Sequence, residues 1–181
     1  VQKNLKITPD IEAMAEKAIA GKTALKDKAR SILEYIQNNF RYVSMSLGLY
    51  SLEPHPTDQV FKNKYGDCKD LSLLCVAMLK VAGIESNIAL FRDEFSITDP
   101  RHDLPIPALF DHAIVSVKDE KGESFYVDPQ LKGYDIEEYP LYYQNAYTFV
   151  ITADGGKFER LPMFPEERAY ARRDIHTVIN S

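Results

Sequence analysis

The sequence predicts an α+β domain in which N-terminal helices, one of them beginning with a cysteine, pack on an antiparallel sheet. Two observations lead to this prediction. From Cys68 to Ala82, apolar residues recur at three- and four-residue steps, which is typical of a helix that buries one face. Further along, segments 111–117 and 124–129 are rich in β-branched and aromatic residues, and the charged, Gly-containing link between them predicts a β-hairpin.

The other elements follow from apolar periodicity and from residues that start or stop helices. We expect Thr8 to cap the first helix and Thr57 to cap a short helical turn. The helix over 23–39 should pack against the helix that starts at Cys68. In chain order, the expected elements are helices at 9–20 and 23–39, an extended segment at 40–44, a helical turn at 58–63, and strands at 84–91 and 146–151.

Two loops at 45–56 and 92–110 contain several prolines and no apolar period. We expect them to form walls or a lid of a cleft. A core domain is expected over residues 1–150, with its motifs between about 26 and 130. Residues 151–181 are then a C-terminal extension or the start of a further β domain.

Composition excludes some classes of protein. The 181 residues, 45% hydrophobic and 27% charged, suffice for one globular domain with a core. A net charge of −5 without a basic tract argues against nucleic-acid binding. No apolar run approaches the ~20 residues of a membrane-spanning helix, so none is expected. The chain begins at Val1 rather than Met, so we expect a trimmed or processed fragment.

Three residues in this order suggest nucleophilic chemistry. Cys68 lies in the first turn of its predicted helix, where free N–H groups and the helix dipole favour thiolate over thiol. His112 opens one strand of the hairpin and Asp128 closes the other, so antiparallel pairing brings them to the same end. The three side chains are therefore a candidate nucleophile, general base and orienting carboxylate.

Simpler interpretations exist for the same residues. A lone cysteine is most often a buried apolar residue, which is the expectation for Cys75. An Asp before Pro commonly ends a strand. A zinc site made from Cys68 and its partners is disfavoured because the sequence has no CxxC or HxxxH pair. Cys68 and Cys75 are about 10 Å apart along a helix, too far for a disulfide, and His55 is expected at the surface.

The motifs also resemble a known family. Tyr65-Gly66-Asp67-Cys68-Lys69-Asp70, Asp111-His112-Ala113 and Tyr126-Val127-Asp128-Pro129, in this order, are similar to the core of the transglutaminase-like superfamily in its bacterial branch. The resemblance implies a papain-like fold, a cysteine protease-like site and a Cys-His-Asp catalytic triad. It implies no particular substrate, since members include protein cross-linkers, peptidases, amidases and inactive binding modules.

One departure from the family concerns the oxyanion hole. Large animal transglutaminases resemble this core but use an indole N–H there, and this chain has no Trp. The Cys68 backbone N–H is one candidate donor. Candidates for the second donor are Gln59, Asn63 and Tyr42.

We therefore expect a hydrolase or acyltransferase that cleaves or transfers amide or peptide acyl groups through a thioester, with no cofactor and no metal. The alternative is a catalytically inactive module that binds a peptide or glycan, with the Tyr-rich tract after Gln130 as a stacking surface. The expected partner is a peptide or protein substrate, including cell-wall peptide or glycan. Bacterial chains of this type are often exported, so a periplasmic or cell-surface location is expected.

Overall fold

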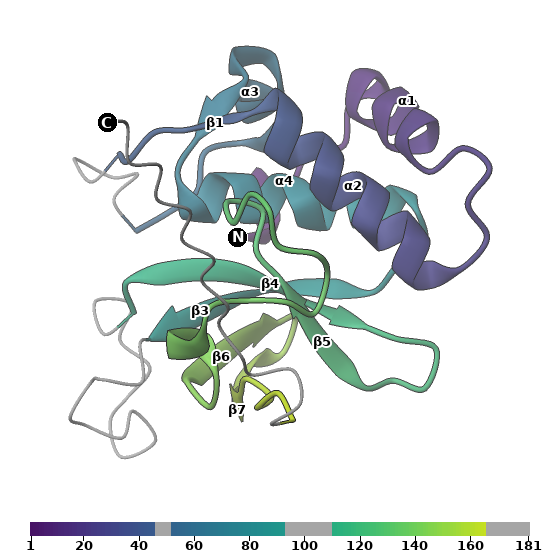
Figure 1. Cartoon of the computed structure of the whole chain (residues 1–181). Helices are drawn as coiled ribbons and strands as arrows, with labels where there is room; N and C mark the ends of the chain where they lie inside the picture. Colours follow the sequence, from purple (N-terminus) through teal and green to yellow (C-terminus); the bar gives the residue numbers. More distant parts are fainter. Residues whose placement is uncertain (46–51, 93–109, 166–181) are drawn as a thin grey trace, which may run out of the picture.

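The computed structural model describes residues 1–45, 52–92 and 110–165. Helices α1 to α4 lie together over one face of an antiparallel sheet, as Figure 1 shows, which confirms the predicted α+β class. The helices are η1 (Gln2–Asn4), α1 (Pro9–Ala18), α2 (Leu25–Asn39), α3 (Thr57–Asn63), α4 (Cys68–Val81) and η5 (Leu141–Tyr143).

Helix α4 is the centre of the helical layer. Every residue from Asp70 to Leu79 is buried, because α1, α2 and α3 surround the helix on one side and the sheet covers the other. Full burial of each large apolar side chain stabilises the fold by about 1.5–3 kcal/mol. The main core, to which α2, α4 and the sheet contribute, includes Ile32, Ile36, Leu71, Leu74, Met78, Ile88 and Val115.

The larger sheet has five strands in the order β5-β4-β3-β6-β7. The predicted part consists of β3 (Ser86–Arg92), β4 (His112–Lys118) and β5 (Ser124–Val127), with β4 and β5 forming the expected hairpin. Strand β6 (Tyr147–Thr152) pairs with the other edge of β3, and β7 (Gly155–Arg160) pairs with β6. The boundary drawn after residue 150 therefore falls inside β6, and the sheet continues to residue 160.

A second, two-stranded sheet leads into α4. Strand β1 (Arg41–Tyr42) pairs in parallel with β2 (Tyr65–Gly66), the last residues before the Asp67-Cys68 helix start. The extended segment predicted at 40–44 is thus tied to the entry of α4.

Two of the predicted helix starts need correction, while the cap of α1 is confirmed. The Thr8 hydroxyl accepts a hydrogen bond from the Ile11 N–H, as expected. Helix α2 begins at Leu25, two residues later than predicted. Thr57 is the first residue of α3 and not its cap, because its hydroxyl instead bonds the backbone N–H and carbonyl of Lys6.

The opposite face of the sheet is covered by the segment after β5. Tyr139 and Tyr143 are buried there in a second apolar cluster, whereas Tyr134 and Tyr142 are exposed. The Tyr-rich tract thus contributes mainly to packing. The cluster consists of Ala89, Phe91, Ile114, Tyr126, Tyr139, Tyr143, Ala146, Val150 and Leu161.

Several expectations fall on residues outside the described ranges. These are most of the two expected cleft loops, at 46–51 and 93–109, and the end of the C-terminal extension at 166–181. Within the described ranges, no helix combines the length and apolar character needed to span a membrane.

Candidate active site at the start of helix α4

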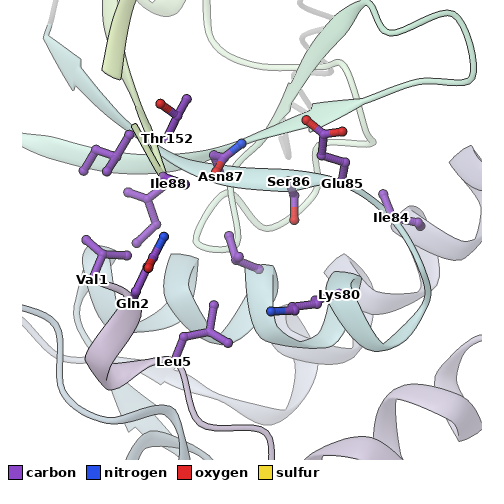
Figure 2. Close-up of a pocket in the computed structure, with 13 residues that line it drawn as sticks. Val1, Gln2, Leu5, Lys80, Ile84, Glu85, Ser86, Asn87, Ile88 and Thr152 are labelled. Atoms are coloured by element: carbon purple, nitrogen blue, oxygen red, sulfur yellow. The ribbon is translucent and has the colours of Figure 1, made fainter. Parts of the chain in front are cut away.

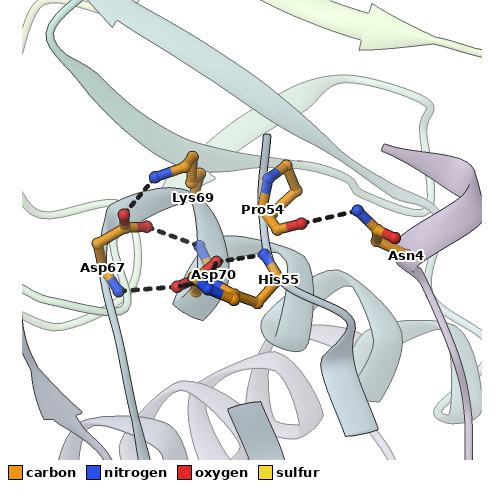
Figure 3. Close-up of polar contacts among 6 residues, drawn as sticks. All are labelled: Asn4, Pro54, His55, Asp67, Lys69 and Asp70. Atoms are coloured by element: carbon orange, nitrogen blue, oxygen red, sulfur yellow. Dashed lines mark hydrogen bonds and ion pairs between the residues drawn. The ribbon is translucent and has the colours of Figure 1, made fainter. Parts of the chain in front are cut away.

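Cys68 is the first residue of α4, and the residues around it form a capping box. The Asp67 carboxylate accepts from the Asp70 N–H at 3.3 Å, and the Asp70 carboxylate accepts from the Asp67 N–H at 3.2 Å (Figure 3). These bonds fix the helix start and satisfy two backbone donors. The first-turn N–H groups have no partner within the helix, so those at Cys68 can face an anionic group.

The residue before the cap must be glycine. A Cβ on Gly66 would lie 2.6 Å from the Asp70 Cβ and 3.3 Å from a Val60 methyl carbon. The backbone of β2 therefore passes directly against the capping box, and a side chain at Gly66 would push Cys68 away from its position.

A buried side chain joins α4 to the strand that carries the histidine. The Ser72 hydroxyl donates to the Ala113 carbonyl at 2.9 Å, and Ser72 is fully buried. This bond holds the first turns of α4 against the start of β4. It therefore brings Cys68 and His112 to the same end of the sheet.

The histidine and the predicted aspartate are in direct contact. His112 Nε2 lies 2.7 Å from Asp128 Oδ2, and Asp128 is 7% exposed. The same oxygen accepts from the Tyr143 hydroxyl at 2.9 Å, while Oδ1 accepts from the Gln130 N–H at 2.9 Å. The buried carboxylate thus has three donors, which compensate its removal from water and fix its orientation.

The environment of His112 favours its protonated form. Burial of the ring lowers the pKa, but the hydrogen bonds to Asp128 and Cys68 and the negative charges of both groups outweigh it. The net result is that the pKa of His112 rises from 6.5 to about 10. Since Nε2 contacts Asp128, Nδ1 is the ring nitrogen available to the Cys68 sulfur.

The acidic residues beside Cys68 are compensated locally. Burial is the main cause that raises the pKa of Asp67, and the neighbouring Lys69 ammonium opposes it through an ion pair. The Lys69 side chain is only 12% exposed, so this positive charge is held close to Cys68. A negative charge at Asp67 disfavours a thiolate at Cys68, and the pairing with Lys69 reduces this effect.

Cys68 and His112 line one cavity of about 270 Å³. Its walls come from the start of α4, from strands β3, β4 and β6, and from the segment just before α3. Most of the lining is apolar, and its ionisable side chains are Cys68, Lys69, Asp111 and His112. The apolar lining consists of Val1, Leu52, Pro54, Ile88, Leu90, Phe110, Ala113 and Ile151.

The three candidate oxyanion donors lie in different places. Tyr42 in β1 pairs with Gly66 in β2, two residues before Cys68. Gln59 and Asn63 line a separate cavity of about 50 Å³, together with His55. Of the three, only Tyr42 is tied to the strand that leads into Cys68, and none of the three lines the cavity of Cys68 and His112.

His55 is a functional-site neighbour that the sequence did not reveal. It is only partly exposed, with 22% of its side chain accessible; its backbone N–H donates to Asp70 Oδ1 at 2.7 Å and its ring Nδ1 lies 3.1 Å from Oδ2 (Figure 3). Asn4 donates to the adjacent Pro54 carbonyl at 2.7 Å. Asp70, fully buried, thus caps α4 and also anchors the segment that carries the Pro54 wall of the cavity.

Tyr143 is the second residue that was missed. It comes from the Tyr-rich tract. Its ring centroid lies 4.4 Å from that of Phe91 and 6.0 Å from that of His112. Burial and the Asp128 charge raise the pKa of Tyr143, so it remains a hydrogen-bond donor to that carboxylate. The only signal in the sequence for this segment was its high Tyr content, which does not reveal which hydroxyl reaches Asp128.

The second cysteine takes no part in this cluster. Cys75 is fully buried and unbridged, as predicted, and burial raises the pKa of its thiol to about 12. Among the described residues, no group of three or more His, Cys, Asp or Glu side chains is arranged to hold a metal ion.

Comparison with protein families gives one match. A family model described as "Transglutaminase-like superfamily" matches residues 12–129, which is more than half of the chain. No curated protein matches the sequence.

Solved structures give matches at low sequence identity. A candidate protease from Parabacteroides distasonis aligns with a TM-score of 0.65 and 20% identity, covering 91% of this chain and 30% of its own. A candidate cysteine protease from Cytophaga hutchinsonii aligns with a TM-score of 0.50 and 18% identity, covering 72% and 42%. The periplasmic domain of TgpA from Pseudomonas aeruginosa gives a TM-score of 0.45 and 16% identity, covering 71% and 46%. The chain spans less than half of each of these structures, and the first two similarities show a shared fold.

Proposed function

Because this chain belongs to the transglutaminase-like superfamily, we propose that it is a cysteine-dependent enzyme that cleaves or transfers amide acyl groups through a thioester. The observation that carries this proposal is the buried His112–Asp128 pair at 2.7 Å beside a cysteine at a helix start. The similarity to a candidate protease and a candidate cysteine protease agrees with it. A periplasmic or cell-surface location stays a prediction.

In the proposed reaction, the Cys68 sulfur attacks the carbonyl carbon of a carboxamide, and its electron pair forms the new C–S bond. His112, protonated on both ring nitrogens, donates the Nδ1 proton to the leaving amine as the C–N bond breaks. The neutral imidazole then takes a proton from water or an incoming amine, which attacks the thioester and releases Cys68. Asp128 holds the ring in position and stabilises its charge in both steps.

The oxyanion that forms on the carbonyl oxygen needs donors that are already in place. The Cys68 N–H at the positive end of α4 is one donor. For the second we propose Tyr42, which is 48% exposed and pairs with Gly66, two residues before Cys68. A donor at this position would act as the indole N–H does in larger relatives.

The test is the rate at which iodoacetamide alkylates Cys68 between about pH 5 and pH 10, in the parent and in His112→Ala. We expect the parent to react faster than the variant over the acidic part of this range, because an imidazolium beside a cysteine favours the reactive thiolate. Cys75 serves as an internal control, since its buried thiol should stay unmodified. Equal rates in both proteins would refute the proposed enzymatic activity and favour an inactive binding module.

A further inference from the structure

The Asp70 carboxylate is built into the start of α4. As part of the capping box it accepts from the Asp67 N–H at 3.2 Å, and Cys68 lies between these two residues in the sequence. The side chain is fully buried, and a Cβ on Gly66 would lie 3.2 Å from Asp70 Oδ2. The carboxylate is therefore enclosed by the strand that leads into α4, so the position of Cys68 depends on how firmly Asp70 is held.

Most of the donors that hold Asp70 come from one residue. The His55 backbone N–H donates to Oδ1 at 2.7 Å, and His55 Nδ1 lies 3.2 Å from Oδ1 and 3.1 Å from Oδ2 (Figure 3). An ionised carboxylate can only accept, so Nδ1 carries the proton of this contact. Within the described residues, His55 thus supplies two of the three donors to a carboxylate that has left water, and Asp67 supplies the third.

His55 is placed to act on the protein and not on the reacting atoms. It does not line the cavity of Cys68 and His112. The separate cavity that it lines with Gln59 has a volume of about 50 Å³, which leaves room for only a few water molecules. An effect of His55 on the nucleophile must therefore pass through Asp70.

The segment that carries His55 has a second support, which does not involve Asp70. Asn4 in η1 donates to the Pro54 carbonyl at 2.7 Å and to the Glu53 carboxylate at 3.1 Å. Helix η1 borders a cavity of about 540 Å³ between itself, the later half of α4 and β3 (Figure 2), and neither His55 nor Asp70 lines this cavity. The two supports are therefore separate, and each can be removed without touching the other.

We propose that His55 is a positioning residue for the nucleophile: through Asp70 it fixes the first turn of α4 and thereby holds the Cys68 sulfur against the His112 ring. This inference rests on the proposed function and adds a residue to its machinery. On the sheet side, Asp128 orients His112; on the helix side, His55 orients Asp70. The nucleophile and its base are thus each held by a contact between a histidine and a buried aspartate.

The experiment measures, in the full chain, the pKa of His112 by NMR and the rate at which iodoacetamide alkylates Cys68. The hydrogen bond and charge of Cys68 are two of the causes that raise the pKa of His112 to about 10, so a displaced Cys68 lowers it. His55→Leu removes the ring donor. We expect the pKa of His112 to fall by about 1 pH unit or more, and alkylation at about pH 6 to slow by about 10-fold. His55→Asn should keep both readouts near those of the parent, because its amide N–H can take the place of Nδ1.

Asn4→Ala is the matched control, because it removes the other support of the same segment and leaves the contact between His55 and Asp70 in place. It should leave both readouts unchanged. A pKa of His112 that is the same in His55→Leu and the parent would overturn the inference, and so would an equal fall in Asn4→Ala or in His55→Asn. If His55→Leu does not fold, His55→Ala replaces it, with the same expected direction.

The two readouts separate this inference from the proposed function. Fast, His112-dependent alkylation of the parent supports the enzyme whatever the His55 variants show. The pKa of His112 is measured without any reaction at Cys68. It therefore tests the role of His55 even if alkylation proves independent of His112.

Discussion

Replacing Asp128 by Asn keeps the shape of the side chain but conflicts with its surroundings. Oδ2 accepts from His112 and Tyr143, and Oδ1 accepts from the Gln130 N–H. All three partners are donors, and an amide offers only one acceptor oxygen. Whichever way the amide points, its NH₂ group must face at least one donor. The negative charge that stabilises the imidazolium is lost as well.

The size of the effect on His112 follows from its present pKa of about 10, against an ordinary value of 6.5. The hydrogen bond and charge of Asp128 are two of the four causes that raise it, and Cys68 supplies the other two. An opposite charge at this distance typically changes a pKa by about 1–3 pH units. Asp128→Asn should therefore lower the pKa of His112 by that amount, which corresponds to about 1.4–4 kcal/mol of lost imidazolium stabilisation.

The assay is a pH titration of the histidine ring resonances by NMR. The chain has four histidines, and the resonance missing from His112→Ala identifies the one of interest. Asp111→Asn is the matched control, since Asp111 is an exposed neighbour whose carboxylate makes no hydrogen bond to His112 in the described structure. A parent His112 that titrates near 6.5, or a pKa that is the same in Asp128→Asn and the parent, would refute the reasoning.

Three further changes test the structure around the site. Tyr143→Phe should lower the free energy of unfolding by about 1.5–3 kcal/mol in urea titrations, because it removes a hydrogen bond to the buried Asp128 carboxylate. Gly66→Ala should lower it by about 1–3 kcal/mol and slow alkylation of the nucleophile, because the new Cβ would lie 2.6 Å from the Asp70 Cβ. The raised pKa of His112 stabilises the fold fully below about pH 6.5, and this contribution is lost as the pH rises through about 10. Relative to His112→Gln, the parent should therefore lose on the order of 5 kcal/mol of unfolding free energy over that interval.

Each of these changes has a control or an opposing result. Tyr142→Phe should be neutral, since Tyr142 is 46% exposed and makes no hydrogen bond within the described structure; equal losses in both tyrosine variants would contradict the proposed bond. Normal stability of Gly66→Ala would mean that β2 can move away from α4. A constant difference between parent and His112→Gln from pH 6.5 to 10 would show that the imidazolium is not stabilised in the fold.

The parts of the fold that could be predicted are those encoded locally. Helix α4, its cysteine at the first position and the β4–β5 hairpin follow from periodicity over short windows. The contact between His112 and Asp128 then follows from hairpin geometry, because two strands joined by a short turn leave few registers. For the same reason, the three candidate catalytic residues could be selected before the structure was known.

The missed features depend on contacts between distant segments. Strand β6 was expected, but its pairing with β3 on the side away from β4 joins residues about 60 apart and has no local signal. His55 lies between two prolines, and only the folded position of Asp70 reveals its partner. Tyr143 was one of several tyrosines, and packing alone determines which hydroxyl reaches Asp128.

The order of the strands has a consequence for how the site forms during synthesis. Because β6 completes the sheet beside β3, and Tyr143 just before it supports Asp128, the cluster around His112 is unfinished until these late residues leave the ribosome. At a synthesis rate of about 5–20 residues per second, the interval from Cys68 to the end of β7 takes roughly 5–20 seconds. Throughout that interval Cys68 lacks the completed His112–Asp128–Tyr143 cluster, which forms only when nearly the whole described domain is present.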